Sequence, residues 1–308
     1  MERIIEFSDF EKAVDEAYKQ FKTVNDGQVS SLLPDANPDD FGIAVTFTDG
    51  RTITRGDVDV AAPLGTIAKI PVASILLSQN SPMEVMQKAA ACPCASPKAK
   101  PDAKLPKGHK FFRAVSAIHH ANDPDAKWDF IADRIEDLMG SAPELDDTLY
   151  KTLSANSVAD NVENALAMAE YVLYDDAPIA IDLALRAKAL KASARQLSVM
   201  GATIAADGVN PLTKNIVFDG AISQNIIGMM AAKGPHKMTL PWNVMAGLPA
   251  KSSFGGSIVG IFPGQFAIAA YSPRLNGSDI SVRAAKAVMT VMRSLQLSVF
   301  QSAALKVK

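Results

Sequence analysis

The stretch PLGTIAK, residues 63–69, joins a predicted β-hairpin to a predicted helix near 66–78. Thr66 and Lys69 stand three positions apart, so on a helix their side chains share one face. A helix N-terminus stabilises negative charge that develops nearby, and a lysine of lowered pKa can take the proton of a hydroxyl. The spacing therefore fits a nucleophile and its base. Taken alone, it is more typical of an ordinary helix start, with Thr66 as a cap and Lys69 in solvent.

Two hairpins are predicted on either side of the middle of the chain. The first covers residues 41–55 and turns at Asp49-Gly50, a dipeptide that favours a two-residue turn. The second covers residues 257–271 and turns at Pro263-Gly264. Both flanking segments are rich in the branched and aromatic residues that strands prefer.

Helices are predicted at both ends and between the hairpins. The first covers 8–22, where Ser8 stands three residues before Glu11 at capping-box spacing, and the last covers 281–299. Further helical stretches lie near 66–78, 127–139, 157–174 and 193–206. Strands near both ends with helices between them predict an α+β fold, in which an antiparallel sheet is flanked by the terminal helices and a helical subdomain is inserted.

The expected subdomains form one intertwined unit. Residues 1–64 and 208–308 are expected to form the sheet subdomain, and residues 65–207 the mainly helical one. Segment 88–110 is rich in Ala, Pro and Lys without clear periodicity, which predicts a long surface loop that acts as a lid or a plain linker.

Composition narrows the class of protein. Hydrophobic residues make up 48% and charged residues 21% of the 308 residues, which favours a globular chain with a sizeable core. Lysine plus arginine number 31 against 33 acidic residues, so no excess positive charge points to nucleic acid as a partner. The N-terminus has no secretory pattern, and no apolar run approaches the roughly 20 residues of a membrane span. We expect a cytoplasmic protein, with Cys92 and Cys94 as reduced thiols.

A second candidate for chemistry is the stretch GLPAKSSFGG, residues 247–256, just before the second hairpin. Lys251-Ser252 resembles the Lys-Ser dipeptide with which serine acyl-transferases of the penicillin-recognising fold line one wall of their cleft, on an edge strand, and the resemblance implies the same role here. The backbone N–H of Phe254 would join that of Thr66 in an oxyanion hole. The alternative interpretation is a glycine-rich turn that leads into a strand.

The order of these elements resembles that of the serine β-lactamase-like folds: hydroxyl-x-x-Lys after an early hairpin, a helical insertion, then Lys-Ser before a late hairpin. Within that group the chain resembles the serine-dependent glutaminases. The resemblance is carried by residues 200–211, 246–252 and 272–275, together with Gly255-Gly256 and Pro263-Gly264. It covers roughly residues 24–300. It implies hydrolysis of the side-chain amide of L-glutamine to glutamate and ammonia through an acyl-enzyme, without a metal or other cofactor.

The resemblance assigns the catalytic positions one at a time. Thr66 stands where the family has its nucleophilic serine, and the base Lys69 is retained. Lys251, Ser252 and the backbone amide of Phe254 are retained as well. The methyl group of a threonine restricts its side-chain rotation and crowds the path of attack.

Most positions that hold glutamine in the family differ here. The asparagine of the family's Asn-Ala-Gly-Ala segment falls at Ser116, and the glutamate of its Ser-Glu pair at Ser157. The asparagine of the following Arg-Asn pair is kept as Asn164. Two family tyrosines fall at Ala184 and His236. Ser116, Ser157, Asn164, Lys251 and Ser252 are thus the candidate substrate-binding residues.

The replacement of the glutamate by Ser157 removes a negative charge that would pair with the ammonium group of glutamine. Such a charged hydrogen bond is worth about 1.5–3 kcal/mol. We therefore expect free glutamine to bind poorly or to be turned over slowly. His236 either relays a proton to the leaving group or lies in a surface loop.

Two histidines and a tryptophan are better explained by structural roles than by metal or substrate binding. His119-His120 lack further metal ligands at a suitable spacing, so a surface pair is favoured and no metal is expected. Trp242 between Met238 and Met245 is more typical of core packing than of a platform for substrate.

The sequence thus predicts a glutaminase-like amidohydrolase that acts on a small-molecule amide, as a homodimer or homotetramer. Two alternatives remain: an inactive protein that keeps the fold for binding or scaffolding, and an acyl-transfer enzyme for another ligand such as a lactam or peptide. Burial of Lys69 beside Thr66 in a polar cleft favours an enzyme, and a filled cleft favours the scaffold.

Overall fold

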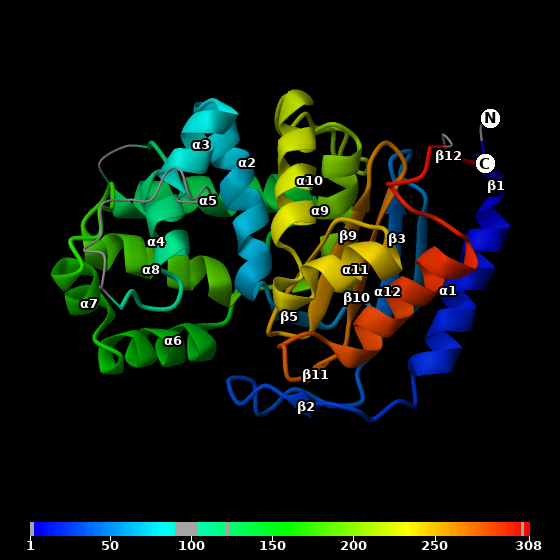
Figure 1. Cartoon of the computed structure of the whole chain (residues 1–308), viewed down its shortest axis with the longest axis horizontal. Coiled ribbons are helices and arrows are strands. Elements are labelled where there is room, and N and C mark those ends of the chain that lie inside the picture. The colour runs from blue at the N-terminus through cyan, green and yellow to red at the C-terminus, as the bar shows by residue number, and fades with distance from the viewer. Residues whose placement is uncertain (1–2, 90–103, 121–122, 303–304) are drawn as a thin grey trace.

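The computed structural model describes residues 3–89, 104–120, 123–302 and 305–308. Its centre is a five-stranded antiparallel sheet in the order β4-β3-β10-β9-β8 (Figure 1). The strands are β3 (Gly42–Phe47), β4 (Thr52–Gly56), β8 (Ala250–Ser252), β9 (Ser257–Phe262) and β10 (Phe266–Tyr271). The two predicted hairpins lie side by side in this sheet, because β3 pairs with β10 from Phe47–Phe266 to Gly42–Tyr271. The expectation of one antiparallel sheet is confirmed.

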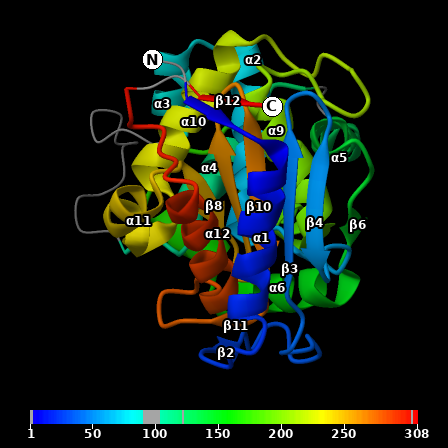
Figure 2. The same cartoon turned by 90° about the vertical axis from the view of Figure 1, so that its right-hand side faces the viewer.

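Helices α1 (Phe7–Phe21), α11 (Thr239–Ala246) and α12 (Val282–Ser294) lie on one face of this sheet (Figure 2). Phe10 of α1 packs edge-on against Phe47 and Phe266, with ring centroids 5.2 and 4.8 Å apart. These side chains are almost fully buried, so they join the terminal helices to the sheet through one apolar core. Both terminal helices were predicted, and both are present.

The start of α1 differs from its predicted cap. The short strands β1 (Arg3–Ile5) and β12 (Leu305–Val307) pair in parallel ahead of the helix, and the N–H of Phe7 donates to the carbonyl of Lys308 at 2.7 Å. The N-cap residue is Glu6, and no side chain caps the helix. The predicted cap at Ser8 is therefore wrong, because pairing between the chain ends starts the helix earlier.

Helix α9 (Ala194–Ala205) covers the other face and packs on β3, β9 and β10. A close approach is possible because Gly201 faces the sheet: a Cβ at that position would lie 2.6 Å from the Cβ of Ala267. Ser193 and Gln196 form a capping box at the start of α9. Helix α10 (Ala221–Lys233) lies beside α9 and reaches across to α2.

The other helices form the half of the molecule at the left of Figure 1. They are α2 (Lys69–Gln79), α3 (Pro82–Lys88), α4 (His109–Ser116), α5 (Pro124–Met139), α6 (Asp147–Ala159), α7 (Val162–Met168) and α8 (Ala177–Ala189). The helix predicted near 157–174 is instead divided between α6 and α7, because Asn161 adopts a left-handed backbone with φ of 51°. None of the described helices is long and apolar enough to cross a membrane.

Small strands connect the two halves. Strands β5 (Ala61–Pro63), β7 (Leu190–Ser193) and β6 (Glu144–Leu145) form a three-stranded sheet in that spatial order, and β2 (Gln28–Val29) pairs with β11 (Arg274–Leu275). Strand β5 leads through the short 3₁₀ helix η1 (Gly65–Ala68) directly into α2. This connection brings the first candidate motif to the boundary between the helices and the large sheet.

Candidate active site

Segment 63–69 is fixed against the turn that follows β8. The hydroxyl of Ser253 donates to the carbonyl of Pro63 at 2.6 Å, so the two segments lie in direct contact. Gly65 has φ of +50°, and a Cβ there would lie 2.7 Å from Ser253 Oγ and 2.8 Å from the ring of Phe254. Only glycine fits this close approach without strain. The structure thus joins the two candidate motifs, although they are almost 200 positions apart in the chain.

Thr66 lies at this contact and is half-buried. Its Oγ1 donates a hydrogen bond to the backbone carbonyl of Ser252 at 2.5 Å. The threonine hydroxyl therefore meets the strand that carries Lys251, as the predicted cleft requires. In this arrangement the hydroxyl proton is directed to a carbonyl, so a transfer to a base requires the O–H to rotate about the Cβ–Oγ1 bond.

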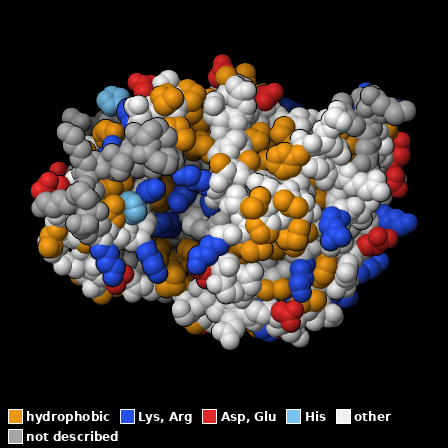
Figure 3. All heavy atoms as spheres, in the orientation of Figure 1, with side chains coloured by type: hydrophobic (Ala, Val, Ile, Leu, Met, Phe, Trp, Pro, Cys, Tyr) orange, Lys and Arg blue, Asp and Glu red, His pale blue; other side chains and the backbone are white. Residues whose placement is uncertain are grey.

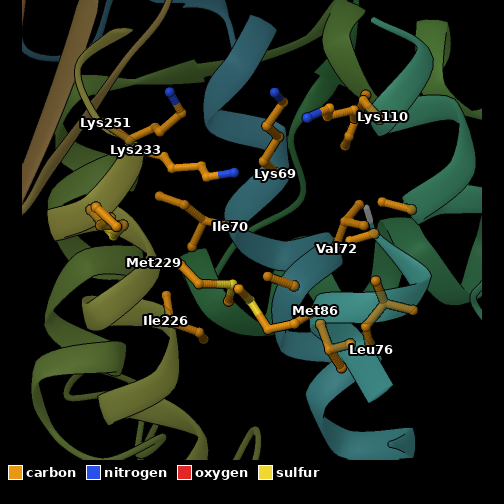
Figure 4. A pocket seen from close by; sticks show the side chains of 17 residues that line it. Lys69, Ile70, Val72, Leu76, Met86, Lys110, Ile226, Met229, Lys233 and Lys251 are labelled. Carbon is orange, nitrogen blue, oxygen red and sulfur yellow. The ribbon is translucent and has the colours of Figure 1, made fainter. Parts of the chain in front are cut away.

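Four lysines line one end of a pocket of about 290 Å³ (Figure 4). Lys69 begins α2, Lys110 belongs to α4, Lys233 ends α10 and Lys251 belongs to β8. In Figure 4 the side chains of Lys110 and Lys233 point toward Lys69 from opposite sides. Lys and Arg side chains also gather around a hollow in the face drawn in Figure 3. None of the described residues that line this pocket is acidic.

Burial and mutual repulsion lower the pKa values of Lys69, Lys233 and Lys251. Burial, followed by the charge of Lys69, lowers the pKa of Lys251 to about 8. Partial desolvation in the pocket, followed by the charges of Lys233 and Lys110, lowers the pKa of Lys69. Lys69 is exposed, whereas burial beside Thr66 was expected of an enzyme, and its access to the water of the pocket limits its desolvation. The arrangement therefore favours a neutral lysine beside Thr66 more than an isolated surface lysine would.

The neighbouring charges that act on Lys69 differ from the expected one. Lys251 was the expected source of positive charge, whereas Lys233 and Lys110 lower the pKa of Lys69, and Lys69 in turn lowers that of Lys251. Lys188 of α8 also has its pKa lowered to about 8, by burial and then by Lys69. No spacing in the sequence links these lysines, because they come from four helices and strand β8 and meet only in the fold.

The remainder of the pocket is apolar. It runs from the lysines along the space between α2 and α10, with α3 at its far end (Figure 4). Its apolar side chains include Ile70, Val72, Leu76, Met86, Ile226 and Met229. One end of the cavity is thus strongly cationic and the other hydrophobic.

Three of the predicted substrate-binding residues lie outside this pocket. The hydroxyl of Ser116 donates to the carbonyl of Arg113 at 2.9 Å and accepts the N–H of Tyr174 at 3.1 Å, which gives it a role in folding. Ser157 belongs to α6, and Asn164 is exposed on α7. None of the three lines the pocket, so the structure does not bring them together with Lys69 and Lys251.

The remaining candidates are placed as follows. His236 begins the 3₁₀ helix η3 (His236–Met238), and its side chain lies outside the described part of the structure. Trp242 is buried and donates from Nε1 to the carbonyl of Leu248 at 2.7 Å, in agreement with core packing. His119 and His120 are exposed, and the described residues include no group suited to a metal ion. Cys92 and Cys94 lie outside the described residues, as does most of the predicted loop.

Comparisons with known proteins agree with this architecture. The solved structure of a probable glutaminase, ybaS, superposes with a TM-score of 0.86 at 28% identity and covers 97% of this chain and all of its own. A probable glutaminase from Bacillus subtilis, solved with 6-diazo-5-oxo-L-norleucine, shares the fold with a TM-score of 0.80 at 17% identity. The fold, with a hydroxyl-x-x-Lys helix start facing a Lys-Ser strand, is therefore of the serine β-lactamase-like class.

Sequence relatives narrow the class further. The Glutaminase family model matches residues 27–300. The Glutaminase of Bacteroides thetaiotaomicron is 36% identical over 97% of this chain and 97% of its own length. Glutaminase 1 of Escherichia coli O157:H7 is 29% identical over 97% of this chain and its own full length. The chain belongs to the Glutaminase family.

Proposed function

We propose that this protein is an amidohydrolase that releases ammonia from the side-chain amide of L-glutamine or a related small amide. Thr66 is the nucleophile and Lys69 the base, and the reaction passes through an acyl-enzyme. The observation that carries the proposal is the contact of Thr66 Oγ1 with the Ser252 carbonyl. Thr66, Ser252 and Phe254 do not themselves line the pocket, but Lys69 and Lys251 of the same two segments do. Membership in the Glutaminase family supports the same activity.

In the proposed reaction, Thr66 turns its hydroxyl from the Ser252 carbonyl to neutral Lys69, which accepts the proton. Oγ1 attacks the amide carbon, and the backbone N–H groups of Thr66 and Phe254 stabilise the negative oxygen. The C–N bond then breaks, and the proton held by Lys69 passes to the leaving nitrogen, which departs as ammonia. Water attacks the resulting ester and releases the carboxylic acid, which restores the threonine.

The crowded lysines have a defined role in this mechanism. A base works best when its pKa lies near the working pH, since it is then neutral often enough to accept a proton. Lys233 and Lys110 lower the pKa of Lys69 in that direction. Lys251, on the opposite wall, faces the same end of the pocket. We retain Ser252 as a wall residue, and His236 as a relay for the proton of the leaving group.

Location and assembly belong to the same proposal. We propose that the protein is cytoplasmic and that it forms a homodimer or homotetramer, and the assembly follows from the family resemblance. Light scattering coupled to size-exclusion chromatography measures the assembly directly. A monomeric mass at micromolar concentration would contradict this part of the proposal.

The test of the function is ammonia release from a panel of primary amides that includes L-glutamine. Thr66→Ala should reduce the rate to background, because no acyl-enzyme can form. Thr152→Ala is a matched control, since Thr152 is an exposed residue of α6 whose hydroxyl only donates to the Thr148 carbonyl. An unchanged rate in Thr66→Ala would refute the assigned nucleophile, and the absence of ammonia from every amide would refute the activity.

A further inference from the structure

The lysine end of the pocket carries positive charge without a matching carboxylate. Lys69, Lys110, Lys233 and Lys251 come from four separate elements and face one cavity, and none of the described residues that line it is acidic. A cleft with charge of one sign attracts ligands of the opposite sign. The described walls therefore suit a carboxylate of the ligand and offer no partner for an ammonium group.

The apolar end gives a second property of the ligand. Ile70, Leu76, Ile226 and Met229 line a continuous hydrophobic surface between α2 and α10, which starts at the lysines (Figure 4). Glutamine offers only its side-chain methylenes to this surface, which are too few to cover it. An alkyl chain covers it, and each buried methylene strengthens binding by up to about fourfold.

The charge of the pocket adds a third constraint. A ligand with a free α-ammonium group would bring a positive charge to Lys110, Lys233 and Lys251, and none of the described residues that line the pocket offers a carboxylate to balance it. Acylation of the amino group removes this charge and supplies the alkyl chain at the same time.

We propose that the substrate is a glutamine whose α-amino group carries an apolar acyl chain. The side-chain amide lies at Thr66, the α-carboxylate binds between Lys110 and Lys233, and the acyl chain follows the apolar surface between α2 and α10. This inference rests on the proposed function. The chemistry is unchanged: water and the amide give ammonia and an N-acylglutamate.

The first experiment measures ammonia release from L-glutamine and from N-acetyl-, N-butanoyl- and N-hexanoyl-L-glutamine. The value of kcat/KM should rise at least tenfold from the acetyl to the hexanoyl compound. Met229→Glu places a carboxylate in the apolar part and should remove this dependence on chain length. Val244→Glu is the matched control, because Val244 is 77% exposed on α11 and outside the pocket. Equal values for all four compounds would overturn the inference.

The second experiment tests the carboxylate contact. N-hexanoyl-L-glutamine should be hydrolysed at least tenfold more efficiently than the same compound with its α-carboxylate converted to a methyl amide. Lys110→Gln should raise KM for the charged compound and leave that of the neutral one nearly constant. Lys151→Gln is the control, since Lys151 is exposed on α6 outside the pocket. Equal efficiency for the charged and neutral compounds would contradict the proposed orientation.

Direct binding separates this inference from the proposed function. In isothermal titration calorimetry, N-hexanoyl-L-glutamate should bind at least tenfold more tightly than L-glutamate, and Lys110→Gln and Met229→Glu should each weaken it. If the ligands and variants bind in this order but no amide releases ammonia, the ligand class is supported and the proposed activity is overturned. Rapid hydrolysis of L-glutamine, with no preference for the hexanoyl compounds in rate or binding, overturns the ligand class and supports the activity.

Discussion

The replacement of Lys251 by Met removes a positive charge that the fold buries at the end of the lysine pocket. The side chain is 7% exposed, and its pKa falls from an ordinary 10.5 to about 8 because of burial and the charge of Lys69. At 1.36 kcal/mol per pKa unit, this difference corresponds to a cost of about 3 kcal/mol for the protonated folded state. Met keeps most of the apolar stem without the charge. We expect Lys251→Met to stabilise the folded protein at pH 7 by up to this amount.

The sign of the pH dependence follows from the same two pKa values. Below about pH 8 the lysine is protonated in both the folded and the unfolded chain, so the full cost is present. Between about pH 8 and 10.5 the unfolded chain binds more protons, so the free energy of unfolding of the wild type rises with pH. Above that window Lys251 is neutral in both states. The advantage of Lys251→Met should therefore shrink to nearly zero by pH 10.5.

Urea denaturation followed by circular dichroism, at pH 7, 8.5 and 10, measures this difference. Lys151→Met is the matched control, since Lys151 is exposed and its substitution should change stability by less than about 0.5 kcal/mol at every pH. The reasoning is refuted if Lys251→Met is less stable than the wild type at pH 7 and the gap between them does not change with pH.

Further predictions concern the glycine contacts and the base. Gly65→Ala should destabilise the protein by about 1–3 kcal/mol and reduce ammonia release, because its Cβ would meet Ser253 and the ring of Phe254; wild-type values in both assays would contradict the close contact. Gly201→Ala should cost about 1–3 kcal/mol in urea denaturation, because α9 would have to move away from Ala267, and an unchanged midpoint would be inconsistent with this packing. The value of kcat/KM should increase with pH through the lowered pKa of Lys69, since only the neutral lysine accepts the proton of Thr66; a profile that falls throughout this range would exclude Lys69 as the base.

The features predicted well from the sequence are those that local patterns determine. The strands of the two hairpins are rich in β-branched and aromatic residues and are joined by Gly-containing turns, so their positions can be predicted without any contact information. The order of elements predicted that residues 63–69 and the strand of Lys251 would face each other, and the hydrogen bond from Thr66 Oγ1 to the Ser252 carbonyl places them together. Local patterns were misleading where tertiary contacts decide, as at Ser8, where the pairing of β1 with β12 starts the helix earlier.

The residues that line the pocket could not be predicted from local sequence patterns. Lys110, Lys188 and Lys233 lie on three helices that meet only after folding. Each lies close enough to Lys69 for the two charges to interact. Ser116 illustrates the opposite case, in which the position carried over by resemblance is occupied by a hydroxyl that holds the chain near Tyr174. The clustering of lysines from separate helices and strands could therefore be recognised only in the folded structure.

The acyl-enzyme on Thr66 is the central claim, and mass spectrometry of the acid-quenched enzyme measures it most directly. The enzyme is mixed with L-glutamine or N-hexanoyl-L-glutamine, quenched within the first turnovers and digested. We predict that the peptide containing Thr66 gains the mass of the acyl group of whichever amide is hydrolysed, and that Thr66→Ala shows no such gain. Ammonia release without an adduct on this peptide in repeated early quenches, or an adduct that persists in Thr66→Ala, would contradict the account.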